Sequence, residues 1–243
     1  MKLLLVRAYR SIGKLLFKKS IVLPVLGTMF IFASGEINTH QTKLSSHRDS
    51  KANGDSIKAH FDVAIQNWDI VFQTSRSDQS VAIQLATNSK YSHCGLIYRF
   101  NDQLFVLEAI EQVRMTPFEE WVARGAGGHF IIKRLKNSEG ILTPETLEKM
   151  KREGERLRGK DYDVTFEWND NRMYCSELVW KVYKRGAELE LGRLQKLTEF
   201  SLSNELVKEK LKERYGSNIP QNELIISPAA IFNSKLLETI HEN

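Results

Sequence analysis

Cysteine is scarce in this chain of 243 residues, which has only Cys94 and Cys175. Two cysteines can form one disulfide, or they can be one reactive thiol and one small buried apolar side chain. The six histidines are scattered, and no HExxH or CxxC spacing typical of a zinc site occurs. The sequence therefore predicts neither a resident metal ion nor a cofactor.

Acidic residues are absent from the first 35 positions, which carry six lysines and arginines. Removing these six from the chain's 35 basic residues leaves 29, against 30 acidic residues, which is a net charge of −1. The formal net charge of +5 therefore comes mostly from the N-terminal segment. Because the rest of the chain has no basic surplus to neutralise phosphates, nucleic acid is not an expected partner.

A long hydrophobic run is also missing, since the apolar stretch IVLPVLGTMFIFA covers only positions 21–33. That is about the length of a signal-peptide core and short for a membrane span. ASG at 33–35 offers small residues at the spacing of a cleavage site. Residues 1–35 are therefore expected to be a signal peptide or an N-terminal membrane anchor, with a helix packed on the body as the alternative. Either of the first two places the body outside the cytoplasm, periplasmic, secreted or anchored at the membrane.

Residues 36–60 are polar and lack periodicity, which predicts a flexible linker before a single folded domain at 61–243. Short apolar stretches predict strands at 69–73, 94–100, 104–110 and 129–135. Helical spacing and capping residues predict helices at 78–89, 143–159, 174–186, 203–216 and 227–232, with Gly186 and Gly216 as stops. Strands in the middle, with helices before and after, indicate an α+β fold with a mainly antiparallel sheet packed against helices.

Cys175 stands at the start of one predicted helix, after the polar, turn-like stretch EWNDNRM. A thiol in the first turn of a helix faces unpaired backbone N–H groups and the positive end of the helix dipole. Both lower the pKa of the thiol and favour the nucleophilic thiolate. The same N–H groups can hold an oxyanion. The alternative for Cys175 is a buried structural cysteine.

His93 stands where a loop enters the strand-like run 94–100, and it could instead be a capping or surface histidine. Residues 101–102 separate this run from the next one, which contains Glu108, and this predicts a hairpin with a two-residue loop. In that register Glu108 is the diagonal neighbour of His93 on the same face of the hairpin. A carboxylate there can hold the imidazole in its useful tautomer and stabilise the imidazolium. Glu108 could instead be a solvated strand charge, but it lies in the apolar run LFVLEAI, where an acid needs a partner. A slip of one residue would put the two side chains on opposite faces.

Cys94 directly follows His93, and neighbours in a strand point to opposite faces of the sheet. The two are therefore expected to be poor catalytic partners. Cys94 is expected to face a helix as a small core residue.

Four stretches together resemble the YiiX-like branch of the NlpC-type cysteine hydrolases: WDIVFQTSRSDQSVAIQLATNSKYSHCGLIY, LFVLEAI, DYDVTFEWNDNRMYCSELVWKVY and ISPAAIF. The resemblance spans about residues 65–235. It implies a circularly permuted papain-like fold, in which the histidine and acid precede the cysteine, whereas unpermuted relatives place the cysteine first. Trp68 stands where the family's first motif has glycine, so the turn before the first strand is where this chain departs from the pattern.

The resemblance implies that Cys175 is the nucleophile, His93 the general base and Glu108 the group that orients His93. It further implies a cell-envelope cysteine hydrolase that cleaves an amide or ester bond through a thioacyl-enzyme intermediate. An N-acyl amide, a lipid and a peptidoglycan peptide are the candidate substrates. An acyltransferase on the same scaffold, or a non-catalytic binding protein that keeps the cleft, remains as the alternative.

Further side chains are candidates for binding the substrate. Gln73 and Tyr91 lie in the stretches that carry the resemblance and are expected to help line the site. Tyr162, Phe166 and Trp168 precede the cysteine helix and could form an apolar wall for an acyl chain, with ordinary core and loop packing as the alternative.

Overall fold

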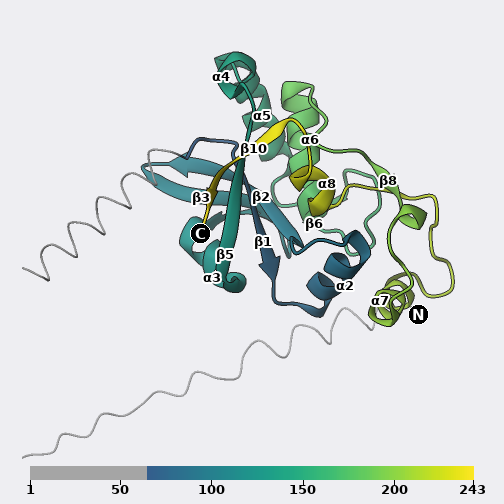
Figure 1. Cartoon of the computed structure of the whole chain (residues 1–243). Helices are drawn as coiled ribbons and strands as arrows, with labels where there is room; N and C mark the ends of the chain where they lie inside the picture. The colour runs from purple at the N-terminus through teal and green to yellow at the C-terminus, as the bar shows by residue number, and fades with distance from the viewer. Residues whose placement is uncertain (1–64) are drawn as a thin grey trace, which may run out of the picture. The chain divides into compact units, whose positions relative to one another are not determined.

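The computed structural model describes residues 65–243, whose main sheet has six strands in the order β10-β5-β1-β2-β3-β4 (Figure 1). Every neighbouring pair in that sheet is antiparallel. This confirms the α+β class and the mainly antiparallel sheet. The predicted segment 1–35 and linker 36–60 lie outside the described residues. No helix within residues 65–243 is long and apolar enough to cross a membrane.

The main sheet consists of β1 (Ile70–Ser75), β2 (His93–Phe100), β3 (Gln103–Ala109), β4 (Val113–Pro117), β5 (Gly125–Leu135) and β10 (Leu237–Glu242). The helices are α2 (Asp78–Thr87), α3 (Phe118–Arg124), α4 (Ser138–Ile141), α5 (Pro144–Leu157), α6 (Cys175–Ala187), α7 (Glu205–Tyr215), α8 (Pro228–Phe232) and a 3-10 turn at Leu197–Glu199. Two small sheets pair β6 (Asp161–Tyr162) with β7 (Arg172–Met173) and β8 (Gln195–Lys196) with β9 (Leu224–Ile225).

The sheet separates two apolar cores. The larger core joins one face of β1, β2 and β3 to α5, α6 and α8, and it includes both cysteines. The smaller core lies between the other face and α3, with Phe118 and Trp121 packed on Val71, Ile97 and Ile132. Alternation along each strand therefore decides which core a side chain enters.

Helix starts follow the predicted capping chemistry in three cases. The hydroxyls of Ser77, Thr143 and Ser227 each accept the backbone N–H three residues later, at 3.2, 3.3 and 3.1 Å. The start predicted at Ser203 is one residue early, because the Asn204 side chain caps α7 by accepting the N–H of Leu206 at 3.0 Å. Asparagine and serine are equally good N-caps, so the sequence does not choose between them.

The prediction that Gly186 ends its helix is wrong by one residue. α6 runs on to Ala187, and Glu188 adopts the left-handed cap conformation with φ 61°. Gly186 instead faces α5, where an added Cβ would lie 2.4 Å from the Cγ of Met150 and 2.7 Å from its Cα. The glycine is therefore required for close approach of α5 to α6, and this packing holds α6 against the sheet.

Trp68 adopts a backbone conformation that favours glycine, the residue expected at this position from the resemblance. Its φ is +73°, in the left-handed region that costs a residue with a Cβ on the order of 1–2 kcal/mol. The side chain is buried and packs edge-on against Tyr98 at 5.8 Å between ring centroids. Its carbonyl accepts the hydroxyl of Tyr183 of α6 at 2.8 Å. Burial of the indole and these two contacts offset the backbone strain of the turn before β1.

Candidate active site

The first residue of α6 is Cys175, whose side chain is 4% exposed. The Glu177 carboxylate caps this end of the helix by accepting the backbone N–H of Tyr174 at 3.4 Å. Lys181, one turn later, donates to Glu177 at 2.6 Å. The Ser176 hydroxyl donates to the carbonyl of Ile226 at 2.8 Å and ties the helix to the segment before α8. Cys175 is therefore held in a fixed first turn, whose backbone N–H groups have no acceptor within the helix.

The hairpin of β2 and β3 has the predicted register, from Phe100 opposite Gln103 to Leu96 opposite Leu107. That register places Glu108 beside His93, with 2.6 Å between the histidine Nε2 and the glutamate Oε2. A one-residue slip would have separated them.

Glu108 is fully buried and its second carboxylate oxygen, Oε1, has two further partners. Thr116 of β4 donates to it at 2.6 Å, and the Arg124 guanidinium at the end of α3 forms an ion pair with it. Burial opposes ionisation, but the bonds from His93 and Thr116 and the charge of Arg124 outweigh it and lower the pKa of Glu108. Glu108 is thus a carboxylate at neutral pH.

Three residues around His93 and Glu108 were not identified from the sequence: Thr116, Trp121 and Arg124. Trp121 of α3 is fully buried and stacks on the His93 ring, with 6.0 Å between centroids and 27° between planes. All three come from β4 and α3, which the sequence analysis did not predict. The stretch TPFEEWVAR contained a usable signal, because Pro117 ends a strand and is followed by helix formers.

His93 and Cys175 interact as an acid–base pair. Burial alone would lower the pKa of His93, but the contact with the Cys175 sulfur and the bond to Glu108 outweigh it and raise that pKa to about 9. Since Nε2 bonds Glu108, the other ring nitrogen is the one available to the sulfur. The arrangement favours an imidazolium beside a thiolate at neutral pH.

Cys94 faces α6, as expected, and is fully buried in the larger core. It nevertheless affects the site, because its thiol and its backbone N–H both act on the Cys175 sulfur and lower the pKa of that thiol. The Cys94 thiol contributes most to the low pKa of Cys175, ahead of the His93 charge, while burial opposes both. Burial and the neighbouring Cys175 raise the pKa of Cys94 well above its ordinary value. Strand alternation points the Cys94 side chain away from that of His93, and the core that Cys94 enters also contains Cys175.

These shifts predict how alkylation of Cys175 depends on pH. While the pH is below the pKa of an ordinary thiol, its alkylation rate rises about tenfold for each unit by which the pH rises, because only the thiolate reacts. Because the pKa of Cys175 is held well below its ordinary value, its rate with iodoacetamide should rise far less than about tenfold per unit between about pH 6 and 8. Labelling followed by peptide mass spectrometry measures this for each cysteine. The chain unfolded in denaturant is the control, and a tenfold rise per unit in the folded chain would contradict the ion pair.

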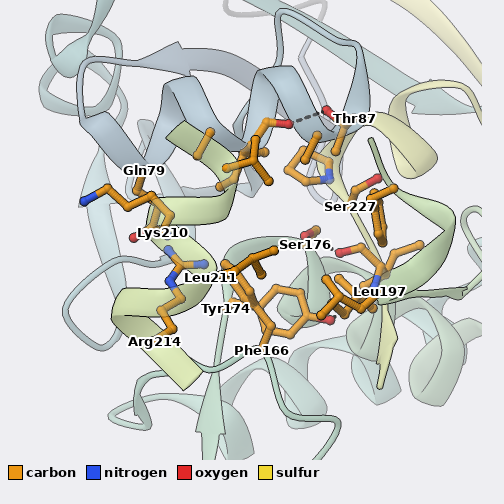
Figure 2. A pocket seen from close by; sticks show the side chains of 18 of the residues that line it. Gln79, Thr87, Phe166, Tyr174, Ser176, Leu197, Lys210, Leu211, Arg214 and Ser227 are labelled. Carbon is orange, nitrogen blue, oxygen red and sulfur yellow. Dashed lines mark hydrogen bonds between the residues drawn. The ribbon is translucent and has the colours of Figure 1, made fainter. Parts of the chain in front are cut away.

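An apolar groove opens beside Cys175, with a volume of about 720 Å³ that includes its open mouth. Its walls come from α2, α7, the loop at residues 197–202 and the segment before α8 (Figure 2). Figure 1 shows α2 and α7 side by side, and these helices form one side of the groove. Aliphatic and aromatic side chains together form most of the lining, and within residues 65–243 no Asp or Glu contributes to it.

Two of the five residues predicted from the sequence to bind the substrate line this groove, and the other three do not. Tyr162 and Phe166 line the groove, and the Tyr162 hydroxyl accepts the side-chain N–H of Gln79 at 2.9 Å. Burial, with the charge of Cys175, raises the pKa of Tyr162, so its hydroxyl stays protonated near the sulfur.

The other three candidates do not line the groove. Gln73 is buried next to Gly125, and Tyr91 packs its ring on Phe232 at 4.3 Å between centroids. Trp168 packs edge-on against Trp180 at 5.2 Å.

Comparison with known proteins identifies what this arrangement resembles. A family model described as a permuted papain-like amidase enzyme, YaeF/YiiX, C92 family, matches residues 64–241. The uncharacterized protein YiiX of Escherichia coli strain K12 is 46% identical over 175 residues, which cover 72% of this chain and 85% of that protein. A crystal structure described as the metalloprotein YiiX from Escherichia coli O157:H7, DUF1105, is 47% identical. It has a TM-score of 0.69 and covers 73% of this chain and 97% of that one.

The description of that relative as a metalloprotein invites a test of the present site. Within residues 65–243, no group of three or more His, Cys, Asp or Glu side chains is placed to hold a metal ion. The His93 Nε2 bonds Glu108, and the Cys175 sulfur contacts His93 and Cys94. The site residues therefore do not fit a resident metal ion, and we derive no step through one.

Proposed function

The chain belongs to the C92 family of permuted papain-like amidases, and on that premise we propose that it is a cysteine amidase acting through Cys175, His93 and Glu108. The permuted papain-like fold expected from the resemblance is thereby confirmed. The observation that carries the proposal is the continuous contact from Glu108 through His93 to Cys175 at the mouth of an apolar groove.

The proposed reaction begins with attack of the Cys175 thiolate on the carbonyl carbon of an amide. Backbone N–H groups in the first turn of α6 stabilise the oxyanion, because they have no acceptor within the helix. The His93 imidazolium gives its proton to the leaving amine, which departs and leaves a thioester on Cys175. Neutral His93 then takes a proton from water, whose oxygen attacks the thioester carbonyl. The C–S bond breaks, which releases the carboxylic acid and restores the Cys175 thiolate beside the His93 imidazolium. Glu108 keeps the imidazole oriented throughout.

The groove supports an acyl group as the part of the substrate that becomes attached to Cys175. A peptidoglycan stem peptide is polar along its length, whereas most of this lining is apolar and would leave many of its polar groups without hydrogen-bonding partners. An acyl chain gains about 0.8 kcal/mol for each methylene that it buries. We therefore propose an N-acyl amide or a related lipid as the substrate, ahead of a peptidoglycan peptide.

Incubating the purified body with N-acyl amino acids, lipid esters and muropeptides separates these classes. The proposal expects hydrolysis of the acyl amides, with release of free acid and amine, followed by mass spectrometry. Turnover of muropeptides alone would move the assignment to wall peptides. Transfer of the acyl group to an added alcohol or amine would indicate an acyltransferase, and binding without turnover of any class would indicate a binding protein.

The proposed location outside the cytoplasm rests on the basic segment and apolar run at residues 1–33. Fractionation of cells that express the full chain tests it, since the proposal expects the protein in the envelope or outside the cell.

Two cations at one end of the groove suggest that the substrate carries an anionic group. Lys210 and Arg214 lie one turn apart on α7 and line the groove, together with Gln79, in the part of Figure 2 opposite Leu197. Lys210 pairs with Glu213 at 2.7 Å. Within residues 65–243, no carboxylate forms an ion pair with Arg214, whose guanidinium lies 4.5 Å from the Phe166 ring centre.

Replacing Arg214 by glutamine should therefore raise KM for an N-acyl amino acid about tenfold, the scale of one charge-assisted hydrogen bond. The same acyl chain on the amidated, neutral amino acid should keep its KM. Steady-state kinetics on the two substrates measures the difference. Lys212→Gln removes the same charge from an exposed position of α7 and should change neither value. Equal effects on the charged and neutral substrates would contradict anion binding by Arg214.

A further inference from the structure

Cys94 is a buried nucleophilic group that the proposed reaction does not use. Both cysteines lie in the same buried core, where α6 packs on β2, although 81 positions separate them, and each thiol shifts the pKa of the other. Both residues belong to the same core cluster under α6, and neither is in a disulfide. A second thiol beside a reactive thiolate is the arrangement needed for reversible oxidation.

Local structure explains why Cys94 reaches that position. In β2 it lies opposite Phe72 of β1 and points toward α6. The pairing of β2 with β3 begins only at Leu96 and Leu107, so the strand is unpaired on that side at Cys94. α6, which begins with Cys175, packs on this strand, so both cysteines enter the same core.

We propose that Cys94 is the resolving cysteine of an oxidation site, in which a hydroperoxide oxidises Cys175 and Cys94 then captures it as a disulfide. The disulfide would inactivate the site reversibly and protect Cys175 from irreversible oxidation. The proposal requires only the two thiols, and it stands whether or not the chain is an amidase.

The chemistry balances with a hydroperoxide as the oxidant. The Cys175 thiolate attacks the terminal oxygen of the peroxide, whose O–O bond breaks, and gives a sulfenic acid and an alkoxide or hydroxide. The Cys94 sulfur then attacks the Cys175 sulfur, the S–O bond breaks, and the departing hydroxide takes the Cys94 proton to form water. Cys175 loses two electrons to the peroxide, and a dithiol reductant returns both cysteines to thiols.

The surroundings of the two cysteines indicate that Cys175 is oxidised first and that Cys94 then forms the disulfide. Cys175 borders the groove, through which a small peroxide can reach it, and it is the more nucleophilic sulfur. Cys94 is fully buried and remains a thiol, so it is protected from direct oxidation. A disulfide needs Cα atoms within about 7 Å of each other, and both cysteines lie where α6 packs on β2.

Three forms of the full chain test the proposal: the wild type, Cys94→Val and Cys94→Ser. Each is treated with hydrogen peroxide, then divided, and one half is reduced with dithiothreitol before labelling with iodoacetamide. In the wild type we expect a cross-linked peptide that joins residues 94 and 175 in a monomer, and nearly full recovery of Cys175 labelling after reduction. In both variants we expect sulfinic and sulfonic acid at Cys175, which reduction does not reverse.

The two variants separate oxidation chemistry from other roles of Cys94. Serine keeps a hydroxyl that can hydrogen-bond Cys175, whereas valine keeps the apolar volume, and neither can form a disulfide. Circular dichroism and the labelling rate before oxidation show which variants are folded. Irreversible oxidation of the wild type to the same extent as the folded variants would overturn the proposal. A disulfide between two chains, seen as a dimer on a non-reducing gel, would overturn it as well.

Discussion

Replacing Cys175 by alanine should reduce kcat/KM on any substrate of this site by at least about 10⁴-fold, because no other group can form the acyl-enzyme. Cys94 does not substitute for it, since that thiol is fully buried and its pKa is raised. Cys175→Ser is the more specific test of the thiolate, because serine keeps the approximate size of the side chain but cannot form a thiolate. Its hydroxyl is a far weaker nucleophile beside the same histidine, so we expect a comparable loss.

His93→Ala should cost nearly as much as the loss of the sulfur, and the two losses should not add. A nucleophile and its base act as one unit, so the double variant Cys175→Ala with His93→Ala should be no slower than Cys175→Ala alone. Hydrolysis of a chromogenic acyl amide or thioester measures all three variants, with circular dichroism as the check on folding. Residual turnover within tenfold of the wild type in Cys175→Ala would show that the reaction occurs elsewhere. Losses that multiply in the double variant would show that His93 acts independently of the sulfur.

Local signals predicted the parts of the site that lie close together in the sequence. The hairpin register follows from a two-residue loop and from alternation along two apolar strands, and it correctly placed Glu108 beside His93. The start of α6 at Cys175 follows from a polar turn before an amphipathic run. These signals act over about fifteen residues, which is the range in which turn length and periodicity fix geometry.

Contacts between distant segments were not accessible in the same way. Alternation correctly directed Cys94 away from His93, but only the packing of α6 on β2 shows that this direction leads to Cys175. The groove requires α2 and α7, which are far apart in sequence, to form one surface. β4 and β10 are the two edge strands of the main sheet, and polar residues interrupt both, so their apolar patterns are weak. Missing β4 and α3 meant missing Thr116 and Arg124.

Replacing Glu108 by glutamine should therefore affect both the chemistry and its pH dependence. The amide keeps the size of the side chain, but it cannot stabilise the imidazolium, and it can hold His93 in the wrong tautomer. We expect kcat to fall by about 10²–10⁴-fold, the scale of losing an orienting carboxylate in a triad. The fully buried Glu108 also neutralises Arg124, so the free energy of unfolding should fall by about 1–3 kcal/mol.

The pH profile gives a readout that a purely structural role for Glu108 would not change. Glu108 helps to raise the pKa of His93 to about 9, and the reaction requires the imidazolium to protonate the leaving amine. In the wild type, activity should therefore fall as pH rises through about 9. In Glu108→Gln the folded-state pKa of His93 is lower, so this alkaline limb moves to lower pH.

Glu111→Gln is the matched control for that measurement, because it removes an exposed carboxylate just beyond the end of β3. It should leave the rate, the alkaline limb and the unfolding free energy unchanged. An alkaline limb that stays near pH 9 in Glu108→Gln would mean that Cys175 alone sets the pKa of His93. Glu108 would then be a structural partner of Arg124 and Thr116, and the orienting role would have to be withdrawn even if the variant were slow.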